Sequence, residues 1–514
     1  MRFTTSLFAL ASALLVANTP VTLAADPVVG GYLLINPTTG AAKLKALADH
    51  AANIPINRLF LSFARPTMVY VAGSKTLEHV GLGYGTSGDF GFADLKAQIT
   101  KLQAGGVEVL LSMGGWNYGC YPYLYTYYSV GGYGEKTPNF YKIQKYAEGH
   151  VSGCTEANMW CYTCEPEEQH TTLADFDIFP EPSYSPTWQA AEDYVRKGAQ
   201  GGTPIFQHDM IPGRSWADPK THITTTVPGS DYFYKQQRDP YEDLVLLAQD
   251  LGLAGVDIDY EEMWHADYYK SGTGPWTNYQ TVYKYAAIMR DVQLNIQKHA
   301  PKMKLGTASA AVGALSSDWW GGNLKGIWYW VFKWYPEVYN FAATGANSGG
   351  VNVMSYDLSS NEQFYECPQP NLCSLHDQVN FYLKSYKDAG MAAHVGYEIG
   401  TPAYPAKDHD PNHQLPLTQP ELTDILHMQG KNGGFFWELY KPADDAKNVD
   451  ATTAAQQICK AALGDATPRC TGTIPQPNAH AGGHWVGGGD EQHHFSYSEP
   501  ESHCNRRKVH YQGY

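Results

Sequence analysis

The chain has 514 residues and a formal net charge of −15, and 43% of its residues are hydrophobic. This balance argues against a nucleic-acid-binding protein or one that docks on an anionic membrane, because phosphate groups attract clustered lysine and arginine side chains. The length would allow two or three domains, although α/β barrels often exceed the usual domain size as one unit. We expect a monomer with no nucleic-acid partner and no membrane insertion.

The first residues have the pattern of a secretory signal peptide. A positive start at Arg2 precedes the apolar run Leu7–Ala17, and the small residues Ala24 and Ala25 follow. The run is too short to span a bilayer, and its flanks are those of a cleaved signal. The alternative is an apolar first helix of the mature fold. We predict that residues 1–24 are removed and that the protein is extracellular, either free or associated with a cell wall.

Nine cysteines in an exported chain predict disulfide bonds, and the odd number leaves at least one without a partner in the chain. Cys367 and Cys373 are close enough in sequence to close a small loop, as are Cys459 and Cys470. A further group lies in one segment: Cys120, Cys154, Cys161 and Cys164. The last two resemble half a zinc site, but outside the cell a disulfide-linked loop is favoured. The sequence leaves the pairing open.

Short apolar runs alternate with amphipathic stretches from residue 28 onward. The expected strands are Val28–Ile35, Arg58–Ala64, Val107–Met113, Leu253–Asp259, Met303–Ala310, Gly350–Tyr356, Met391–Tyr397 and Gly433–Trp437. The stretches between them are typical of helices, for example Phe92–Leu102, Tyr241–Leu251, Tyr279–His299 and Gln419–Gln429. Eight strand–helix units with strands apolar on both faces predict an α/β fold, a (β/α)8 TIM barrel spanning residues 26–470.

Two segments do not fit this repeat. Residues 117–238 follow the third strand and form an insertion, rich in tyrosine, on the side of the barrel where the active site is expected. The insertion is either a wall that faces the substrate or a disulfide-linked subdomain. Residues 471–514 contain many glycines, histidines and prolines and few aliphatic residues, so we predict a low-complexity, flexible tail. The tail histidines could bind a metal, but we favour a solvated tail and predict no metal site.

The fourth expected strand carries the candidate chemistry. Because alternate residues of a strand point to opposite sides, Asp257, Asp259 and Glu261 all face the barrel axis, with successive positions roughly 6.6 Å apart. Crowded like charges raise the proton affinity of at least one carboxyl, and Glu261 lies nearest the rim where barrel enzymes bind substrate. A glycosidase acid needs such a proton-bearing carboxyl. A buried hydrogen-bonded network or a metal site would be the alternatives.

Four motifs in barrel order resemble glycoside hydrolase family 18, the chitinases and their relatives. Gly255-Val-Asp257-Ile-Asp259-Tyr-Glu261 resembles the family signature D-G-x-D-x-D-x-E. The other three are Ser112-Met-Gly114-Gly115, Met354-Ser-Tyr356-Asp357 and Gly433-Gly434-Phe-Phe-Trp437-Glu438. One position departs, because Ala254 replaces the first aspartate of the signature. We expect this replacement to deprive Asp257 of a supporting partner. The protein should then remain active, with an altered pH profile of its activity.

The resemblance implies substrate-assisted, retaining cleavage of β-1,4-linked N-acetylglucosamine polymers, with chitin or chitooligosaccharides as the partner and no cofactor. Glu261 would be the acid, and Asp259 and Tyr356 would hold the acetamido group of the sugar, with Asp257 below them. The implied substrate-binding residues are Trp437, Asp357, Met354, Tyr32, Phe63 and Trp116. Tyr32 and Phe63 could equally be core residues. The short connection after the seventh strand favours an open, endo-acting groove.

Other functions remain open at this point. Glu261 and Glu398, at the ends of strands four and seven, could form the acid and nucleophile of a different retaining glycosidase. An endo-β-N-acetylglucosaminidase acting on N-glycans would carry the same motifs. A non-catalytic, lectin-like chitin-binding protein typically loses the acid, which is present here, but Ala254 favours that reading.

Overall fold

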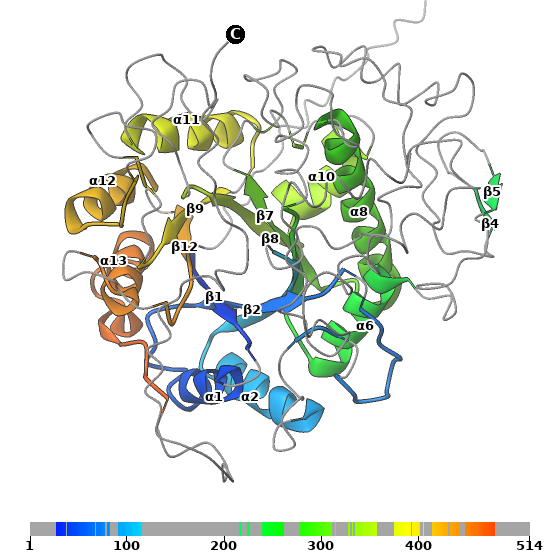
Figure 1. The fold of residues 1–514 in the computed structure, drawn as a ribbon, viewed down its shortest axis with the longest axis horizontal. Helices are drawn as coiled ribbons and strands as arrows, with labels where there is room; N and C mark the ends of the chain where they lie inside the picture. Colours follow the sequence, from blue (N-terminus) through cyan, green and yellow to red (C-terminus); the bar gives the residue numbers. More distant parts are fainter. Residues whose placement is uncertain are drawn as a thin grey trace, which may run out of the picture.

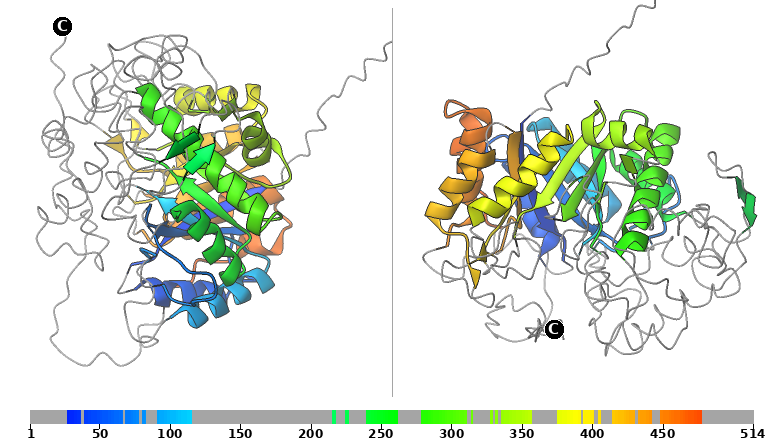
Figure 2. Two further views of the ribbon diagram at one scale, coloured as in Figure 1. Left: turned by 90° about the vertical axis from the view of Figure 1, so that its right-hand side faces the viewer. Right: turned by 90° about the horizontal axis from the view of Figure 1, so that it is seen from above.

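The computed structural model describes most of residues 27–115, 239–261, 278–310 and 335–477, together with 215–217, 224–226 and a few residues between 314 and 332. Within these ranges, the longer stretches that the structure does not describe are residues 83–90, 357–374, 406–413 and 442–447. The described chain forms a closed barrel of eight parallel strands with helices outside it, as Figures 1 and 2 show. The predicted (β/α)8 fold is confirmed.

The barrel strands are joined in the order β1-β12-β9-β8-β7-β6-β3-β2, and β1 pairs with both β2 and β12 to close it. Their bounds are β1 (Val28–Leu34), β2 (Arg58–Ala64), β3 (Glu108–Gly114), β6 (Gly255–Asp259), β7 (Lys304–Ala310), β8 (Ser348–Met354), β9 (Ala393–Glu398) and β12 (Gly433–Trp437). The predicted strands agree with these within two residues at almost every end, because apolar runs define buried parallel strands.

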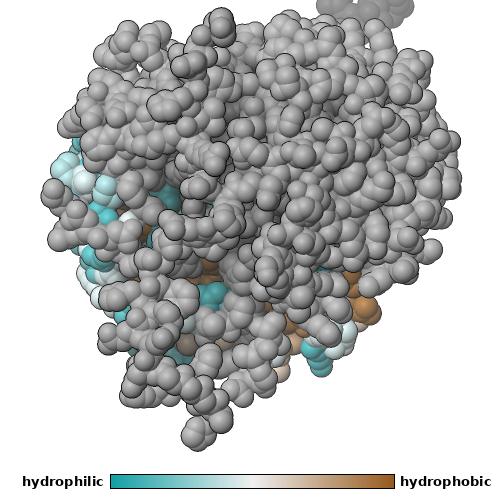
Figure 3. All heavy atoms as spheres, viewed as in Figure 1, coloured by the Kyte–Doolittle hydropathy of each residue, from teal (hydrophilic) through white to brown (hydrophobic). Residues whose placement is uncertain are grey.

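Helices follow the strands around the outside of the barrel. They are α1 (Gly40–Asp49), α2 (Phe92–Ala104), α6 (Pro240–Leu251), α8 (Asn278–His299), α10 (Pro336–Tyr339) with the π-helical turn η4 (Asn340–Thr344), α11 (Leu375–Asp388), α12 (Gln419–Gln429) and α13 (Ala451–Leu463). The described surface at the left edge of Figure 3 is largely hydrophilic, on the side where Figure 1 places α12 and α13. No described helix is long and apolar enough to cross a membrane.

Helix α6 leads directly into the strand that carries the candidate acid. The Asp239 side chain accepts a hydrogen bond from the backbone N–H of Tyr241 at 2.9 Å, and Pro240 occupies the first turn. Both features start a helix, because they satisfy or remove amide groups that have no partner inside it. Gly252, with φ of 78°, ends the helix in the left-handed conformation that glycine adopts without strain. These local signals fix where β6 begins.

A cluster of charges closes the N-terminal end of the barrel. Arg58 Nη2 lies 2.6 Å from Glu108 Oε2, and Lys304 contacts the other oxygen of Glu108. These three residues begin β2, β3 and β7, and the Arg58 side chain is almost fully buried. A buried arginine must be paired, since an isolated charge in the interior is costly. The positive charge of Arg58 reaches the interior of the barrel below the predicted carboxylates.

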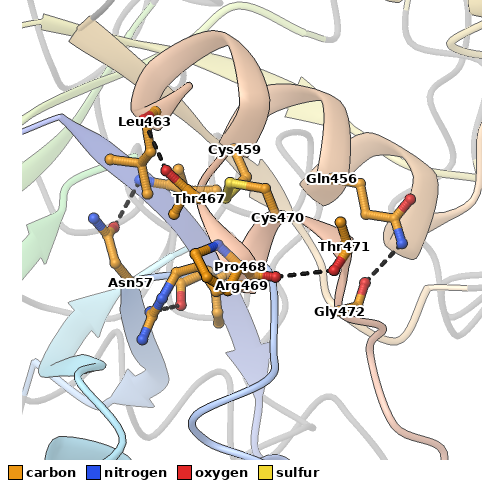
Figure 4. The surroundings of a disulfide bond; sticks show 12 residues. Asn57, Gln456, Cys459, Leu463, Thr467, Pro468, Arg469, Cys470, Thr471 and Gly472 are labelled. Carbon is orange, nitrogen blue, oxygen red and sulfur yellow. Dashed lines mark hydrogen bonds between the residues drawn. A yellow bond between two sulfur atoms is a disulfide. The ribbon is translucent and has the colours of Figure 1, made fainter. Parts of the chain in front are cut away.

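A disulfide bond between Cys459 and Cys470 ties α13 to the 3-10 helix η6 (Pro468–Thr471), as Figure 4 shows. This pairing closes one of the two short loops that the cysteine spacing allowed. The guanidinium of Arg469 donates to the carbonyl oxygens of Ile56 and Gly105 at 2.6 and 2.7 Å, which fastens η6 to the barrel. The other seven cysteines lie outside the described residues.

The C-terminal segment stays packed slightly beyond the predicted boundary. Ile474 is 5% exposed, its N–H donates to Thr452 Oγ1 at 3.0 Å, and the Tyr440 hydroxyl donates to the carbonyl of Pro475 at 2.7 Å. The globular part therefore continues past residue 470, and the predicted tail from 478 onward lies outside the described residues. Of the predicted insertion 117–238, the structure describes one antiparallel pair, β4 (Ser215–Ala217) and β5 (Thr224–Thr226).

Candidate active site

The β6 strand places the three predicted carboxyls at different depths. Asp257 and Asp259 are 0% and 4% exposed inside the barrel, while Glu261, two residues beyond Asp259, is half-buried. The intervening Val256, Ile258 and Tyr260 are buried among the apolar residues of the core. The alternation of a strand therefore gives an inner row of acids whose uppermost member is the most accessible.

A glycine on the neighbouring strand β7 leaves space for the row of carboxyl groups. Asp257 lies in register between Ser112 of β3 and Gly306 of β7. A Cβ atom on residue 306 would stand 3.1 Å from Asp257 Oδ1, which is closer than an ordinary contact. A larger residue at that position would push on the carboxylate. The barrel interior is therefore shaped around Asp257.

Two hydroxyl groups from other strands hold Asp257. Tyr32 Oη donates to Asp257 Oδ2 at 3.0 Å, and Ser112 Oγ donates to the same oxygen at 2.7 Å. Burial raises the pKa of Asp257 to about 6, although both hydrogen bonds and the positive charge of Arg58 oppose this rise. Hydrogen bonds to the charged form of a carboxyl always favour that form. Asp257 thus changes its charge in the mildly acidic range.

Asp259 is more strongly affected than Asp257. Burial raises its pKa well above the usual value, and the negative charges of Glu261 and Asp257 raise it further. Like charges this close do not all ionise together, so the row as a unit retains a proton where isolated carboxyls would have lost theirs. The sequence predicted this crowding, and the structure supplies a second cause, namely desolvation. The arrangement can hold a proton beside Glu261.

Ala254 does not affect Asp257 as the sequence analysis expected. Its backbone N–H donates to Val109 O, so the strand pairing of β6 already extends to residue 254. Counting back from Asp257, position 254 has the opposite parity, so its side chain faces the outer side, and Ala254 packs against the apolar core. The partners of Asp257 come from β1 and β3 instead. The expectation that Ala254 deprives Asp257 of support is therefore not upheld.

Aromatic rings form a layer beside the carboxyl row. The rings of Phe63 and Trp437 stack with centroids 5.6 Å apart, and Tyr32 lies 6.0 Å from Trp437. Trp437 is half-buried, whereas Tyr32 and Phe63 are 1% and 2% exposed. Gly115, with φ of 75°, makes this possible, because a Cβ there would lie 2.4 Å from the Phe63 ring. Trp437 is therefore the ring with surface left for a ligand, and the other two support it from below.

The end of β8 carries two further predicted site residues, Met354 and Tyr356. Tyr356, just beyond the strand, is half-buried, and its ring centroid is 6.3 Å from that of Phe435. Its hydroxyl is close enough to influence the ionisation of Tyr32. Met354 is buried at the strand end, with 6% exposure. Asp357 and Trp116, the other two predicted binding residues, lie outside the described residues.

Glu398 is committed to an ion pair. Its Oε1 atom lies 2.5 Å from Lys441 Nζ, and both side chains are largely buried. The residue is next to Trp437 in the β9–β12 pairing. The ammonium group of Lys441 therefore occupies one of the two oxygens of this carboxyl group. Within the described residues, no group of histidine, cysteine, aspartate and glutamate side chains is arranged to bind a metal.

Sequence reasoning missed the polar residues that surround Asp257 deeper in the barrel. Arg58, Asn352 and His394 are each at most 5% exposed and lie on strands that are mostly apolar. Their signal was available in the sequence, because a polar residue inside a mostly apolar strand must find a buried partner. The partner itself could not be named, since it depends on the register between strands.

No protein-family model matches the sequence, and no curated protein matches it. Among solved structures, the chain is similar to a GH18 chitinase from Pseudoalteromonas aurantia, with 12% identity over 85% of this chain and 99% of that one and a TM-score of 0.38. A chitinase from Rhizomucor miehei (13% identity, 84% and 98% covered, TM-score 0.35) and one from Bacteroides thetaiotaomicron (12%, 86% and 98%, 0.37) are also similar.

Proposed function

We propose that this chain is a secreted chitinase of glycoside hydrolase family 18 that cleaves β-1,4 bonds between N-acetylglucosamine units. One observation carries the proposal. A buried carboxyl with a strongly raised pKa, Asp259, lies one strand repeat below the half-exposed Glu261 on the same side of β6. On β12, across the barrel from β6, the half-buried Trp437 presents an aromatic surface, which suits the flat C–H face of a sugar.

The proposed reaction begins with proton transfer from the Glu261 carboxyl to the glycosidic oxygen. As the bond between that oxygen and the anomeric carbon breaks, the carbonyl oxygen of the substrate's own 2-acetamido group bonds to the anomeric carbon. The products of this step are a cyclic oxazolinium ion and a released saccharide whose 4-hydroxyl group carries the transferred proton. Water then attacks the anomeric carbon, gives its proton to the Glu261 carboxylate and reopens the ring. The two inversions leave the configuration retained.

The neighbouring residues stabilise charge that develops during this reaction. Asp259 accepts the acetamido N–H and, when ionised, offsets the positive charge of the oxazolinium, while Tyr356 donates to the acetamido oxygen. The negative charge of Asp257 favours a proton on Asp259 in the resting enzyme. A proton that moves from Asp259 toward Asp257 as the cation forms would strengthen the stabilisation. Both carboxyls lie in a region with little water, where such interactions are strongest.

An endo-acting groove is the form of cleavage that we propose. The connection between Glu398, the last residue of β9, and Gln419, the first of α12, contains the short ribbon formed by β10 (Tyr404–Pro405) and β11 (Gln414–Leu415). A connection of this length has no room for a separate domain that would wall off one end of the groove. Action on N-glycans and non-catalytic chitin binding remain the competing functions.

The proposal is tested with chitohexaose and cellohexaose, which differ in the 2-acetamido groups. We expect rapid cleavage of chitohexaose to internal fragments, with β-anomers seen first by proton NMR, and little or no cleavage of cellohexaose. Efficient cleavage of cellohexaose would favour a two-carboxylate mechanism and overturn the substrate-assisted one. Binding of chitohexaose without cleavage would indicate the lectin-like function, and release of glycans from a glycoprotein in the absence of chitohexaose cleavage would indicate the N-glycan function.

A further inference from the structure

His394 lies in the barrel interior with no assigned role. It is on β9, is 2% exposed, and lies directly opposite Asn352 in the β8–β9 pairing. Its Nδ1 atom is 3.0 Å from Asn352 Oδ1. Because an amide oxygen only accepts hydrogen bonds, Nδ1 must carry the hydrogen atom and donate it. The imidazole is therefore the Nδ1–H form when it is neutral.

This contact is the first of three that lead to the carboxyl row. Asn352 Nδ2 donates to the hydroxyl oxygen of Tyr32 at 3.3 Å, and the Tyr32 hydroxyl donates to Asp257 Oδ2 at 3.0 Å. Burial and the negative charge of Asp257 raise the pKa of Tyr32, so its hydroxyl keeps the proton that it donates. Every donor in the chain from His394 to Asp257 points the same way. Hydrogen bonds aligned in this manner polarise and strengthen one another.

The surroundings keep the imidazole neutral. Burial, assisted by the positive charge of Arg58 on β2, lowers the pKa of His394 to about 3. The other ionisable groups that act on this chain are Asp259 on β6, Tyr356 after β8 and Tyr285 on α8. A neutral histidine is required here, because a second positive charge next to Arg58 would have no partner.

Gly350 provides the space for the ring. Its φ of +94° is one that residues with side chains rarely adopt, and a Cβ atom there would lie 2.2 Å from His394 Cε1 and 2.7 Å from Nδ1. The ring is thus pressed against the backbone of β8, where it reaches the amide of Asn352. The position of His394 is fixed by the barrel itself.

We propose that His394 is a positioning residue whose Nδ1–H fixes the orientation of the Asn352 amide, so that Tyr32 must direct its hydroxyl hydrogen to Asp257. The alternative orientation of the amide would place its oxygen toward Tyr32 and compete with Asp257 for that hydrogen. His394 therefore favours the ionised form of Asp257 from three strands away. The kinetic consequence rests on the proposed chitinase function, whereas the hydrogen-bond chain does not.

The test compares His394→Leu, His394→Gln, Tyr32→Phe and the double variant His394→Leu/Tyr32→Phe by the pH dependence of kcat/KM on chitohexaose. Loss of the hydrogen-bond chain weakens a hydrogen bond to the ionised form of Asp257. The acidic limb of the kcat/KM profile should therefore move to higher pH by about 0.5–1 pH unit in His394→Leu. His394→Gln retains a donor and should stay near the wild-type profile. The double variant should match Tyr32→Phe.

Two results would overturn the inference. One is a His394→Leu profile that superimposes on that of the wild type while the melting temperature falls, which would show a purely structural role. The other is an equal shift from His394→Leu in the Tyr32→Phe background, since the effect would then not pass through Tyr32.

A second measurement needs no activity. Nitrogen-15 NMR of the wild-type protein should show His394 as the neutral Nδ1–H tautomer between pH 5 and pH 8, and either the other tautomer or a cation would refute the chain. If the wild type cleaves no chitin oligomer, the proposed function fails by itself. The four variants are then compared by infrared titration of the buried Asp257 carboxyl, with the same order of shifts expected.

Discussion

The hydroxyl oxygen of Tyr32 lies 3.0 Å from Asp257 Oδ2, although the two residues are 225 positions apart in the sequence. This bond joins the first strand of the barrel to the strand that carries the candidate acid. Ser112 contacts the same oxygen from β3, one of the two strands between them. The buried carboxylate is therefore held by hydroxyl groups from β1 and β3, and Asp259 and Glu261 lie above it in the same segment.

Replacement of Glu261 by glutamine should abolish catalysis and leave binding intact. The amide has nearly the shape of the carboxyl but cannot donate the required proton, so kcat on chitohexaose should fall by roughly 10²–10⁴-fold. Calorimetric titration should give a dissociation constant within a few-fold of the wild-type value. Glu398→Gln is the matched control, because that carboxylate is paired with Lys441, and it should cost far less. A comparable loss in both variants would instead favour an acid–nucleophile pair.

Replacement of Asp257 by asparagine should stabilise the fold at neutral pH. The folded-state pKa of about 6 lies above the usual aspartate value, so between about pH 4 and pH 6 the folded state binds more protons than the unfolded state. Stability from this group is therefore present at low pH and lost as the pH rises through 6. The asparagine variant lacks this loss. Its free energy of unfolding relative to the wild type should therefore rise by up to about 3 kcal/mol between pH 4 and pH 7. Urea unfolding of both proteins at pH 4 and pH 7 measures the difference between their free energies of unfolding. A difference that does not change with pH would refute the prediction.

Replacement of Trp437 by alanine should weaken substrate binding. The ring is half-buried on the stacked ring of Phe63, so truncation removes the exposed aromatic surface and the cover over the layer beneath. We expect KM for chitohexaose to rise roughly tenfold or more, equivalent to about 1.4 kcal/mol. Trp437→Phe keeps an aromatic face for stacking, so its KM should lie between those of the wild type and the alanine variant. An unchanged KM in the alanine variant would remove Trp437 from the binding surface.

Loss of the Cys459–Cys470 disulfide should destabilise the barrel without affecting the chemistry. The bond closes a short loop, separated by 11 positions, and such loops contribute about 2–3 kcal/mol by restricting the unfolded chain. The double variant Cys459→Ala/Cys470→Ala should unfold at lower urea concentration, with kcat/KM at 25 °C unchanged. Reduction of the wild type with dithiothreitol should give the same shift. If the midpoint does not move, Arg469 and its contacts hold this segment alone.

Strand alternation allowed much of the site to be predicted from the sequence. A run with acids at every second position can only place them on one side, so the burial of Asp257 and the accessibility of Glu261 follow once β6 is assigned. The eight strands were also found, because each is an apolar run bounded by turn residues. These features depend on local sequence alone.

The contacts between strands could not be predicted in the same way. Which residue of β1 or β8 reaches Asp257 depends on the stagger of the whole barrel, which no single segment encodes. Tyr32 was therefore left open between the sugar subsite and the core, and the structure buries it near Trp437 with its hydroxyl on Asp257. His394 had no signal except its polarity. The error over Ala254 was different in kind, because its parity was available in the sequence.

The most direct test of the central claim uses partially deacetylated chitosan, in which acetylated and free amino sugars are mixed. Only a sugar with an acetamido group can supply the internal nucleophile, and that sugar becomes the new reducing end after cleavage. The products are labelled at their reducing ends and identified by mass spectrometry. The account predicts N-acetylglucosamine at essentially every new reducing end, and glucosamine at a substantial share of them would contradict it.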